Sequence, residues 1–529
     1  MQAGSEPGPA RDLRVGRHAG RSHAWLVGLA TGLAALVLYA LTAARGAEWQ
    51  DSGFHQYRII TGQLEHPLGL ALSHPLHYWL GRFACAIPGG DPLLRINLVS
   101  ALCGAVGIGV LAGLVARLGR SRAAGLLAGA AAGLAHSFWQ MSALTETYTL
   151  AAALMVIEWA LLLRFVRTQR VGWLIAVFAV NGLHVADHML GSLTAVTYAV
   201  LMVERVVRRR VAWQWVPVAV VVWCLAASPY LVPIVEHYQR TGDVIGTVHS
   251  ALFGAGGGAT SQGFTSEVFN TSMSGGQLKR AVLTFGYCFP SATVLIALVG
   301  LWRRARGRWR MFRYVLLAQT VIIFAFVARY RIVDLYTYFV PVCALTGLWF
   351  GLGVARLLRR CPRPRGRRWL TAGLVVNALL PVAVYIVFPR VAEARGWLRG
   401  QMRDLPFRNE YEHFFQPWRR WDDSPERFAE MALKAAGPDG WLLADSTTAP
   451  MTAAVQAVRG SEAGVRVYMG RLCLSGQERP SLTDADLLAF VQEGGVVIAV
   501  PSAELRAIVP ATLEIEDEPP LWRLRLPAR

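Results

Sequence analysis

Long apolar stretches recur along this chain, and they constrain its fold more than any other feature. Each is near the length that an α-helix needs to cross a bilayer. The chain has 529 residues, of which 54% are hydrophobic, and a mean hydropathy of +0.37, too apolar for a soluble protein of this size. A mainly α-helical, polytopic membrane protein is therefore expected, with about eleven spans. They are predicted at residues 24–44, 92–116, 123–141, 147–163, 171–186, 189–203, 211–235, 281–301, 314–328, 335–355 and 370–389.

Basic residues lie mainly in short clusters between these stretches. Residues 1–389 contain 36 Lys and Arg against 14 Asp and Glu, whereas residues 390–529 contain 17 against 20. Six clusters on one side of the membrane hold 27 basic residues, and the opposite-side loops up to Arg331 hold 9. Because cytoplasmic loops are enriched in Lys and Arg, the clusters and the N-terminus are predicted to be cytoplasmic. No motif that reads RNA or DNA accompanies this charge, so no nucleic-acid partner is expected.

This topology divides the chain into three parts. Residues 1–23 form a basic cytoplasmic N-terminus, and the apolar stretch after it is predicted to be a retained span, not a cleaved signal peptide. Residues 24–389 form the transmembrane domain, with external loops at 45–91 and 236–280. In residues 390–529, candidate strands such as GWLLADS alternate with candidate helices such as APMTAAVQAVRG. A separately folded, extracytoplasmic α/β domain is predicted there, serving acceptor binding or assembly and not the chemistry.

Three smaller features complete this organisation. Residues 171–203 lie between two basic clusters, so both ends should be cytoplasmic and the segment should form a hairpin of short or tilted helices. One long tilted helix is rejected, because it would place the later arginine clusters outside. The glycine-rich segment FGAGGGATSQGF of the second external loop fits either a flexible connector or a mobile lid. Seven cysteines without a CxxC pair indicate neither a disulfide framework nor a zinc site.

The first external loop concentrates ionisable side chains beside the membrane, in EWQDSGFHQYRIITGQLEHPLGLALSHPLHYWLGR. Such groups are costly at a membrane boundary and indicate a functional site. In a short helix over 51–62, Asp51, His55 and Arg58 would share one face. A carboxylate there can take a proton from an attacking hydroxyl, and an arginine can hold a phosphate. The alternatives are a helix cap at Asp51 and cationic anchors at the interface.

Other polar residues near the external surface are candidates for donor or acceptor binding. His66 and His74 each precede a proline, which disfavours helix at the histidine, so short broken helices are expected around them. Glu146 opens the fourth span, where it can cap the helix or face a groove. The turn of the predicted hairpin carries a further group, for which substrate contacts are favoured over metal ligation: His184, Asp187 and His188.

A last group lies at the external mouth of the tenth span, in ARYRIVDLYTYFVP. Arg329 and Arg331 run against the positive-inside bias, and an anionic lipid headgroup would explain them. Asp334 and Tyr336 follow directly and are candidate binding residues. The alternative is an Arg–Asp pair at the start of a helix.

Together these motifs resemble the GT-C glycosyltransferase superfamily. More narrowly, the chain resembles a bacterial member of the uncharacterised-domain family that includes the human transmembrane O-mannosyltransferase acting on plexin-type receptors. The resemblance covers most of the chain and is strongest over 48–200. It is carried by Asp51-Ser52-Gly53, His66-Pro67, His74-Pro75, Leu80-Gly81-Arg82, Arg95-Ile96-Asn97-Leu98-Val99-Ser100, Glu146-Thr147-Tyr148, Gly182-Leu183 with His188, Asp334 with Tyr336, Tyr338 and Pro341, and Arg408-Asn409-Glu410-Tyr411.

The resemblance implies an inverting glycosyltransferase of the bacterial inner membrane. A polyprenyl-phosphate donor would supply one sugar, such as mannose or another hexose, to a protein or glycan acceptor on the extracytoplasmic face. Asp51 would be the catalytic base, and arginines would hold the lipid phosphate as it leaves. Phe54 stands where many relatives carry a glutamate, so a metal-assisted reaction is not indicated and no cofactor is expected.

A different class of function, a transporter or flippase of a lipid-linked saccharide, is the alternative. A transporter would place ionisable groups near the membrane midplane and would show internal repeats. Here the charged candidates cluster at one face, and no repeat is found in the sequence. The enzyme is therefore favoured.

Overall fold

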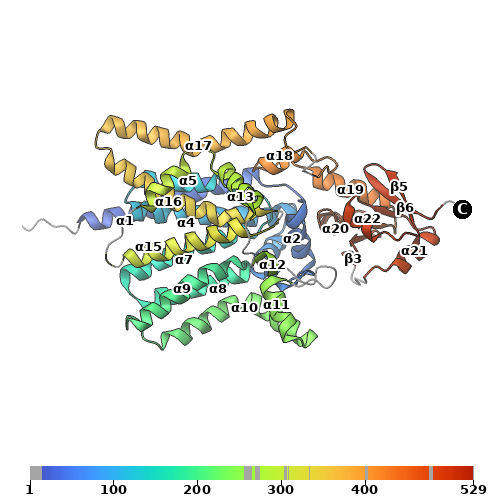
Figure 1. Ribbon diagram of the computed structural model, residues 1–529, viewed down its shortest axis with the longest axis horizontal. Helices are drawn as coiled ribbons and strands as arrows, with labels where there is room; N and C mark the ends of the chain where they lie inside the picture. The colour runs from blue at the N-terminus through green and yellow to red at the C-terminus, as the bar shows by residue number, and fades with distance from the viewer. Residues whose placement is uncertain are drawn as a thin grey trace, which may run out of the picture.

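The computed structural model describes residues 15–254, 265–268, 274–302, 307, 309–332, 334–399, 403–475 and 481–527. Long helices run side by side in one bundle, and a smaller mixed domain from the end of the chain lies at one end of this bundle (Figure 1). The predicted mainly α-helical membrane protein with a small C-terminal α/β region is confirmed. The centre of the glycine-rich loop and the start of the basic N-terminus lie outside the described residues.

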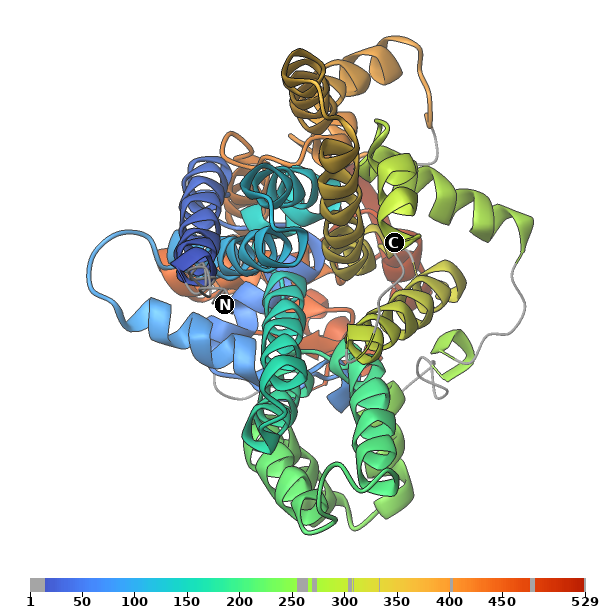
Figure 2. The ribbon, with the colours of Figure 1, turned by 90° about the vertical axis from the view of Figure 1, so that its left-hand side faces the viewer.

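The bundle and its loops are built from seventeen α-helices and two 3₁₀-helices in the described residues. They are α1 (Val15–Thr42), α2 (Gln50–Thr61), η1 (Leu70–Leu72), α3 (Pro75–Ala86), α4 (Pro92–Gly119), α5 (Arg122–Gly133), α6 (His136–Ala143), α7 (Tyr148–Thr168), α8 (Val171–Asp187), α9 (Leu190–Val207), α10 (Trp215–Thr241), α11 (Val244–Phe253), α12 (Thr265–Val268), α13 (Gly275–Cys288), α14 (Thr293–Leu301), α15 (Trp309–Arg329), η2 (Leu335–Tyr338), α16 (Phe339–Arg360) and α17 (Pro364–Ala394). Viewed along the bundle, α17 lies at one edge and the α9–α10 pair at the opposite edge (Figure 2).

Within the described parts of the chain, eight helices are long and apolar enough to cross a membrane. A ninth candidate is the α13–α14 pair, whose two helices meet at an angle of 98°. Pro290 lies at this break, where its missing N–H interrupts the helical hydrogen bonds. Two other predicted spans are also not single long helices. The stretch 123–141 is divided between α5 and α6, and the stretch 171–186 is α8, an apolar helix of 17 residues.

The predicted hairpin at residues 171–203 is confirmed. Helices α8 and α9 pack against each other and are joined at His188 and Met189. Gly182 lets α8 lie directly against α10, because a Cβ at this position would come within 2.5 Å of the carbonyl oxygen of Trp223. The hairpin is therefore held against the bundle through a backbone contact that a larger residue would break.

The C-terminal domain consists of five helices and one mixed sheet in the residues described. Its elements are α18 (Glu410–Phe415), α19 (Ser424–Ala436), β1 (Trp441–Ala444), α20 (Ala449–Arg459), β2 (Arg466–Met469), β3 (Leu472–Cys473), α21 (Asp484–Gln492), β4 (Val497–Ala499), α22 (Ala503–Ile508), β5 (Glu514–Glu518) and β6 (Leu521–Arg525), with α18 leading into the domain from the bundle. The strand order is β3-β2-β1-β4-β6-β5. Strands β2, β1 and β4 are parallel, as the strand–helix alternation predicts, and the other three are antiparallel.

The hydrophobic core of the C-terminal domain extends into the first external loop. Its core includes Trp49, Phe54 and Tyr57, which belong to α2 and the residue before it. The indole N–H of Trp49 also donates to the Ser424 hydroxyl at 2.9 Å, and the Tyr57 hydroxyl donates to the Leu474 carbonyl at 2.6 Å. The first external loop therefore supplies part of this core, and separate folding of the C-terminal domain stays a prediction against which this shared core speaks.

Candidate active site

Helix α2 carries the Asp-Ser-Gly segment and lies between the bundle and the C-terminal domain (Figure 1). Asn97 of α4 fixes its position. The Asn97 amide nitrogen donates to the carbonyls of Ala44 and Gly46, both at 3.0 Å. The Asn97 amide oxygen accepts from Gln56 of α2 at 3.0 Å and from the Thr145 hydroxyl at 2.5 Å. One buried amide thus joins the start of the external loop, α2 and the segment before α7.

Ser100, one turn further along α4, fixes Glu146. Its hydroxyl accepts from the backbone N–H of Glu146 and donates to the carbonyl of the same residue, both at 3.0 Å. The Glu146 carboxylate in turn accepts from the hydroxyl of Ser52 at 2.7 Å. The Arg-x-Asn-Leu-x-Ser motif therefore holds Glu146 directly against the Asp-Ser-Gly segment.

Three carboxyl groups from distant parts of the sequence converge at the start of α2. Asp51 lies in the first turn of this helix, and its carboxyl is within hydrogen-bond reach of Asp334, which precedes η2. Glu146 is buried and interacts electrostatically with both aspartates. Asp51 is itself open to solvent, although protein atoms surround the recess that contains it. The sequence pattern around Phe54 suggested that Asp51 has no acidic neighbour, and the fold provides two.

This crowding changes the acidity of all three groups. The many protein atoms around Asp51 reduce its contact with water although its side chain stays accessible, and together with the charge and hydrogen bond of Asp334 they raise the pKa of Asp51 to about 7. Burial likewise raises the pKa of Asp334. Burial and the neighbouring Asp51 hold the pKa of Glu146 well above its usual range. Because like charges at close distance disfavour one another's ionisation, each of these three groups keeps its proton to a higher pH than an isolated carboxyl group would.

Next to the carboxyl groups, imidazole and phenol rings form a continuous row. The His55 ring contacts Tyr78 through a 2.9 Å hydrogen bond and lies 3.8 Å from the Glu146 carboxylate. His74 stands edge-on to His55 with ring centroids 5.3 Å apart and lies against His188 at 5.1 Å. His188 contacts Tyr148 at 5.0 Å. The fold therefore brings the predicted residues His55, His74 and His188 to one wall of the site.

These histidines are neutral at physiological pH. Burial and the neighbouring rings hold the pKa of His55 and His74 well below the usual range, and burial alone lowers the pKa of His77 to about 4. Neutral imidazoles can donate one hydrogen bond and accept another. They can therefore contact sugar hydroxyls without adding positive charge beside the carboxyl groups.

Arg58 does not have the role suggested by its helical spacing. Its guanidinium is 1% exposed and donates to the Tyr78 hydroxyl at 2.5 Å and to the carbonyls of Leu64 and Leu72. It is not among the groups that shift the pKa of Asp51. Arg58 thus holds the loop after α2, and its guanidinium is engaged by neutral groups of this loop and of α3 instead of Asp51.

Arginines from another part of the bundle lie closer to the carboxyl groups. Arg280 of α13 interacts electrostatically with Asp334. Arg329 donates to the carbonyl of Val268 at 3.1 Å, and Arg331 donates to the side chain of Gln277 at 3.2 Å. Arg329 and Arg331 are thereby placed beside α13, the helix that carries Arg280. The sequence prediction omitted Arg280. Lys279 and Arg280 are two basic residues in a segment predicted to be external, which is the same signal that singled out Arg329 and Arg331.

The predicted residues of the α8–α9 hairpin separate into two groups. His188 belongs to the ring row, and the Asp187 carbonyl accepts from His74 at 2.7 Å. His184 instead lies deeper and pairs with Glu158 at 3.0 Å. Glu158 also accepts from Tyr198 at 2.9 Å and from Asn181 at 3.1 Å. Glu158 was missed in the sequence, although a lone acidic residue inside an apolar span is a recognisable signal.

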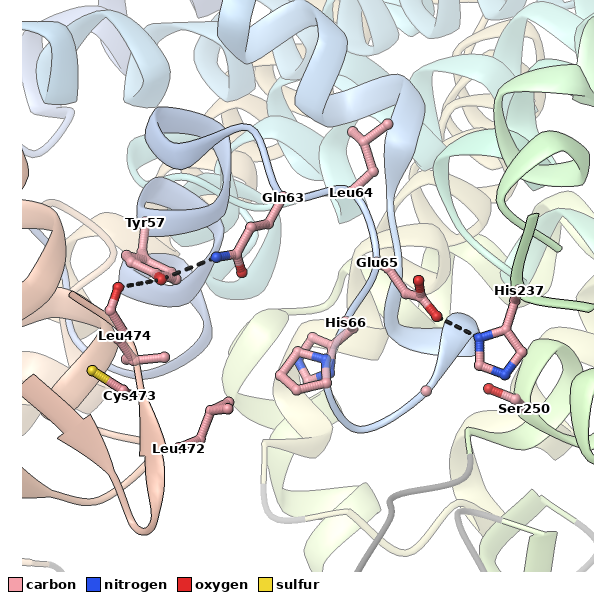
Figure 3. Close-up of a pocket in the computed structure, with 12 residues that line it drawn as sticks. Tyr57, Gln63, Leu64, Glu65, His66, His237, Ser250, Leu472, Cys473 and Leu474 are labelled. Carbon is pink, nitrogen blue, oxygen red and sulfur yellow. Dashed lines mark hydrogen bonds and ion pairs between the residues drawn. The ribbon is translucent and has the colours of Figure 1, made fainter. Parts of the chain in front are cut away.

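His66 and Tyr336 lie at the margins of the site. The His66 ring contacts Phe54 of α2 with centroids 4.8 Å apart, and His66 lines a cavity of about 520 Å³ between the first external loop and β3 (Figure 3). Tyr336 lies in η2 with its ring 6.5 Å from that of Phe414. Among the described residues, no group of three His, Cys, Asp or Glu side chains is arranged to hold a metal ion.

Comparison with known proteins agrees with this arrangement. The family model for dolichyl-phosphate-mannose-protein mannosyltransferase matches residues 65–232, which include His74, Glu146 and His188. No curated protein matches the sequence. The crystal structure of ArnT from Cupriavidus metallidurans is similar with a TM-score of 0.53 in the apo state and 0.50 bound to undecaprenyl phosphate. In both comparisons the sequence identity is 16%, and the match covers 94% of this chain and 97% of the ArnT chain.

A looser match is the apo oligosaccharyltransferase of Archaeoglobus fulgidus, with a TM-score of 0.47 and 14% identity over 82% of this chain and 63% of that one. The fold is that of the GT-C membrane glycosyltransferases, and the predicted resemblance to this superfamily is confirmed.

Proposed function

We propose that this protein transfers a single sugar from a polyprenyl-phosphate donor to a hydroxyl of an extracytoplasmic acceptor. The observation that carries the proposal is the contact between the carboxyl groups of Asp51 and Asp334 at the start of α2, beside Glu146. A carboxyl group whose pKa is about 7 is well matched to general base catalysis at neutral pH. The match to a lipid-phosphate mannosyltransferase family and the likeness to an ArnT bound to undecaprenyl phosphate support a lipid donor.

The proposed reaction is a direct displacement at the anomeric carbon. The acceptor oxygen forms a bond to this carbon while its proton passes to the ionised Asp51 carboxylate. The bond between the anomeric carbon and the phosphate oxygen breaks, and the electron pair leaves with the lipid phosphate. One displacement inverts the configuration of the sugar. Protonated Glu146, held by Ser52 and Ser100, keeps the net charge of the carboxyl cluster low, so that one negative charge remains for the base.

Arginines at the rim are proposed to stabilise the leaving phosphate. Arg280, Arg329 and Arg331 lie beside Asp334, at the mouth where a lipid headgroup would enter from the membrane surface. An arginine–phosphate contact is a charged hydrogen bond, so Arg329→Ala or Arg331→Ala should weaken donor binding by roughly 1.5–3 kcal/mol. Arg240→Ala is a suitable control, because Arg240 pairs with Glu65 in a different loop. Unchanged donor affinity in both rim variants would remove this assignment.

The function is tested with the purified full-length protein in lipid nanodiscs. Polyprenyl phosphates carrying radiolabelled mannose, glucose or arabinose are incubated with an extracytoplasmic protein fraction and with cell-envelope glycans. The labelled product is then identified by mass spectrometry, which assigns both the sugar and the acceptor. Label transferred by the wild type, but not by Asp51→Asn, supports the proposal. Label that crosses the membrane of a sealed vesicle without transfer or hydrolysis would instead indicate a transporter.

A further inference from the structure

A groove of about 540 Å³ runs along the outside of the bundle, between α1, α4 and α7, away from the candidate active site. Its walls carry large apolar side chains that face outward. Leu33 of α1 is 54% exposed, and Leu102 and Val106 of α4 are 52% and 43% exposed. In a bilayer these side chains contact lipid chains.

The groove follows the seam where α1 and α4 come closest. Gly28 and Gly32 of α1 lie against Gly109 and Gly113 of α4, a small-residue spacing typical of close helix contacts in membranes. A Cβ on Gly28 would lie 2.8 Å from the Gly109 carbonyl oxygen, and a Cβ on Gly109 would lie 2.9 Å from the Gly28 carbonyl oxygen. Because the glycines at this seam have no side chains, the leucines and valines around them form the two walls of the groove, which is also called the furrow below.

One end of the furrow is positively charged. Arg117 of α4 and Arg164 and Arg167 of α7 line it, at the ends of these two helices. Both helices begin beside the candidate active site, with Asn97 and Tyr148, so the arginines lie at the opposite end of the bundle. The positive-inside rule places this end at the cytoplasmic surface.

We propose that this groove binds one anionic phospholipid from the cytoplasmic leaflet, with its phosphate on the three arginines and one acyl chain along the furrow. The sixteen residues from Leu102 to Arg117 span about 22 Å of helix. This exceeds the roughly 15 Å of hydrocarbon in one leaflet, so a whole acyl chain fits. Basic pockets between transmembrane helices on the cytoplasmic side are suited to anionic headgroups. A second copy of this chain is disfavoured as the occupant of the groove, because its own three arginines would face these three positive charges.

The experiment measures binding of defined lipids to the full-length protein by native mass spectrometry and by thermal unfolding in detergent. Phosphatidylglycerol should bind one per chain and raise the unfolding temperature, whereas phosphatidylcholine should not. Two variants remove different parts of the site: Arg117→Gln with Arg164→Gln removes charge, and Val106→Trp fills the furrow. Each should weaken phosphatidylglycerol binding about tenfold, the effect of losing one charged hydrogen bond or its equivalent in contact area.

The matched control is Arg122→Gln with Arg170→Gln, which removes two arginines from the same two loops outside the groove. This control should bind phosphatidylglycerol like the wild type. Equal loss in the control would mean that only the general positive charge of this surface attracts the lipid. Equal responses to both lipids, full binding by Val106→Trp, or a dimer that replaces the bound lipid would each overturn the proposal.

Discussion

At the scale of single residues, the clustering of three carboxyl groups decides how the candidate site works. Asp51 lies against Asp334, Glu146 accepts from Ser52, and the pKa values of all three carboxyl groups are raised. The cluster therefore contains groups with different tasks, although all three are carboxylic acids. Conservative amide substitutions distinguish these tasks, because an amide preserves the shape of a protonated acid but cannot accept a proton.

The first prediction separates the base from its neighbour. Asp51→Asn should lower the rate of sugar transfer about 10²–10⁴-fold, the usual effect of losing a general base, with folding and donor binding retained. Glu146→Gln should keep most of the activity, because glutamine replaces a carboxyl group that is already neutral. Transfer rates at saturating donor check both. The opposite result, an active Asp51→Asn and an inactive Glu146→Gln, would assign the base to Glu146.

The second prediction concerns pH. Because the base must be ionised and the pKa of Asp51 is about 7, the transfer rate should rise with pH up to neutrality and then level off. Asp334→Asn removes the like charge that raises this pKa, so the rising limb should move to lower pH. The pH profile of kcat/KM in wild type and variant measures the shift. A limb that stays in place would show that Asp334 does not control the ionisation of the base.

At the scale of structural elements, the sequence predicted that α2 is a helix but did not predict which distant segments α2 contacts. The helix over 51–62 was expected, and so were the hairpin at 171–203 and most C-terminal strands, because local periodicity and turn residues determine them. The contact of Asp51 with Asp334 and the docking of α20 on α2 join segments hundreds of residues apart. No local pattern encodes such contacts, so Arg58 was assigned to Asp51 by helical spacing alone.

The third prediction tests the docking of α2 on α20. A Cβ at Gly53 would lie 2.8 Å from the Cβ of Met451 and closer still to the Glu48 carbonyl oxygen. Gly53→Ala should therefore destabilise the protein by about 1–3 kcal/mol, the range for overpacking, and should also lower activity by moving Asp51. Gly373→Ala in α17 is the control, since no atom lies within 4 Å of its added Cβ. Thermal unfolding should be unchanged or slightly improved in this control.

At the scale of the whole molecule, the chain forms one catalytic unit from its two ends. Loss of residues 390–529 should abolish donor hydrolysis as well as transfer, because Trp49, Phe54 and Tyr57 lose their packing partners. The isolated C-terminal segment should in turn expose this apolar face and unfold without cooperativity. Co-expression of the two segments should restore activity if they dock as described. Activity of the truncated chain alone would contradict this dependence.

The contact between α2 and the C-terminal domain also sets an order on the biogenesis of the enzyme. Gln50 donates from its backbone N–H to the Thr447 carbonyl, and Tyr57 donates to the Leu474 carbonyl, so the first external helix pairs with residues that are synthesised much later. Segments generally fold as they emerge, N-terminal first. On α2, however, Asp51 reaches its final position only after the segment that contains Thr447 and Leu474 has been made and has docked. A chain that lacks this segment should insert into the membrane but remain inactive, so activity reports that the contact with α2 has formed.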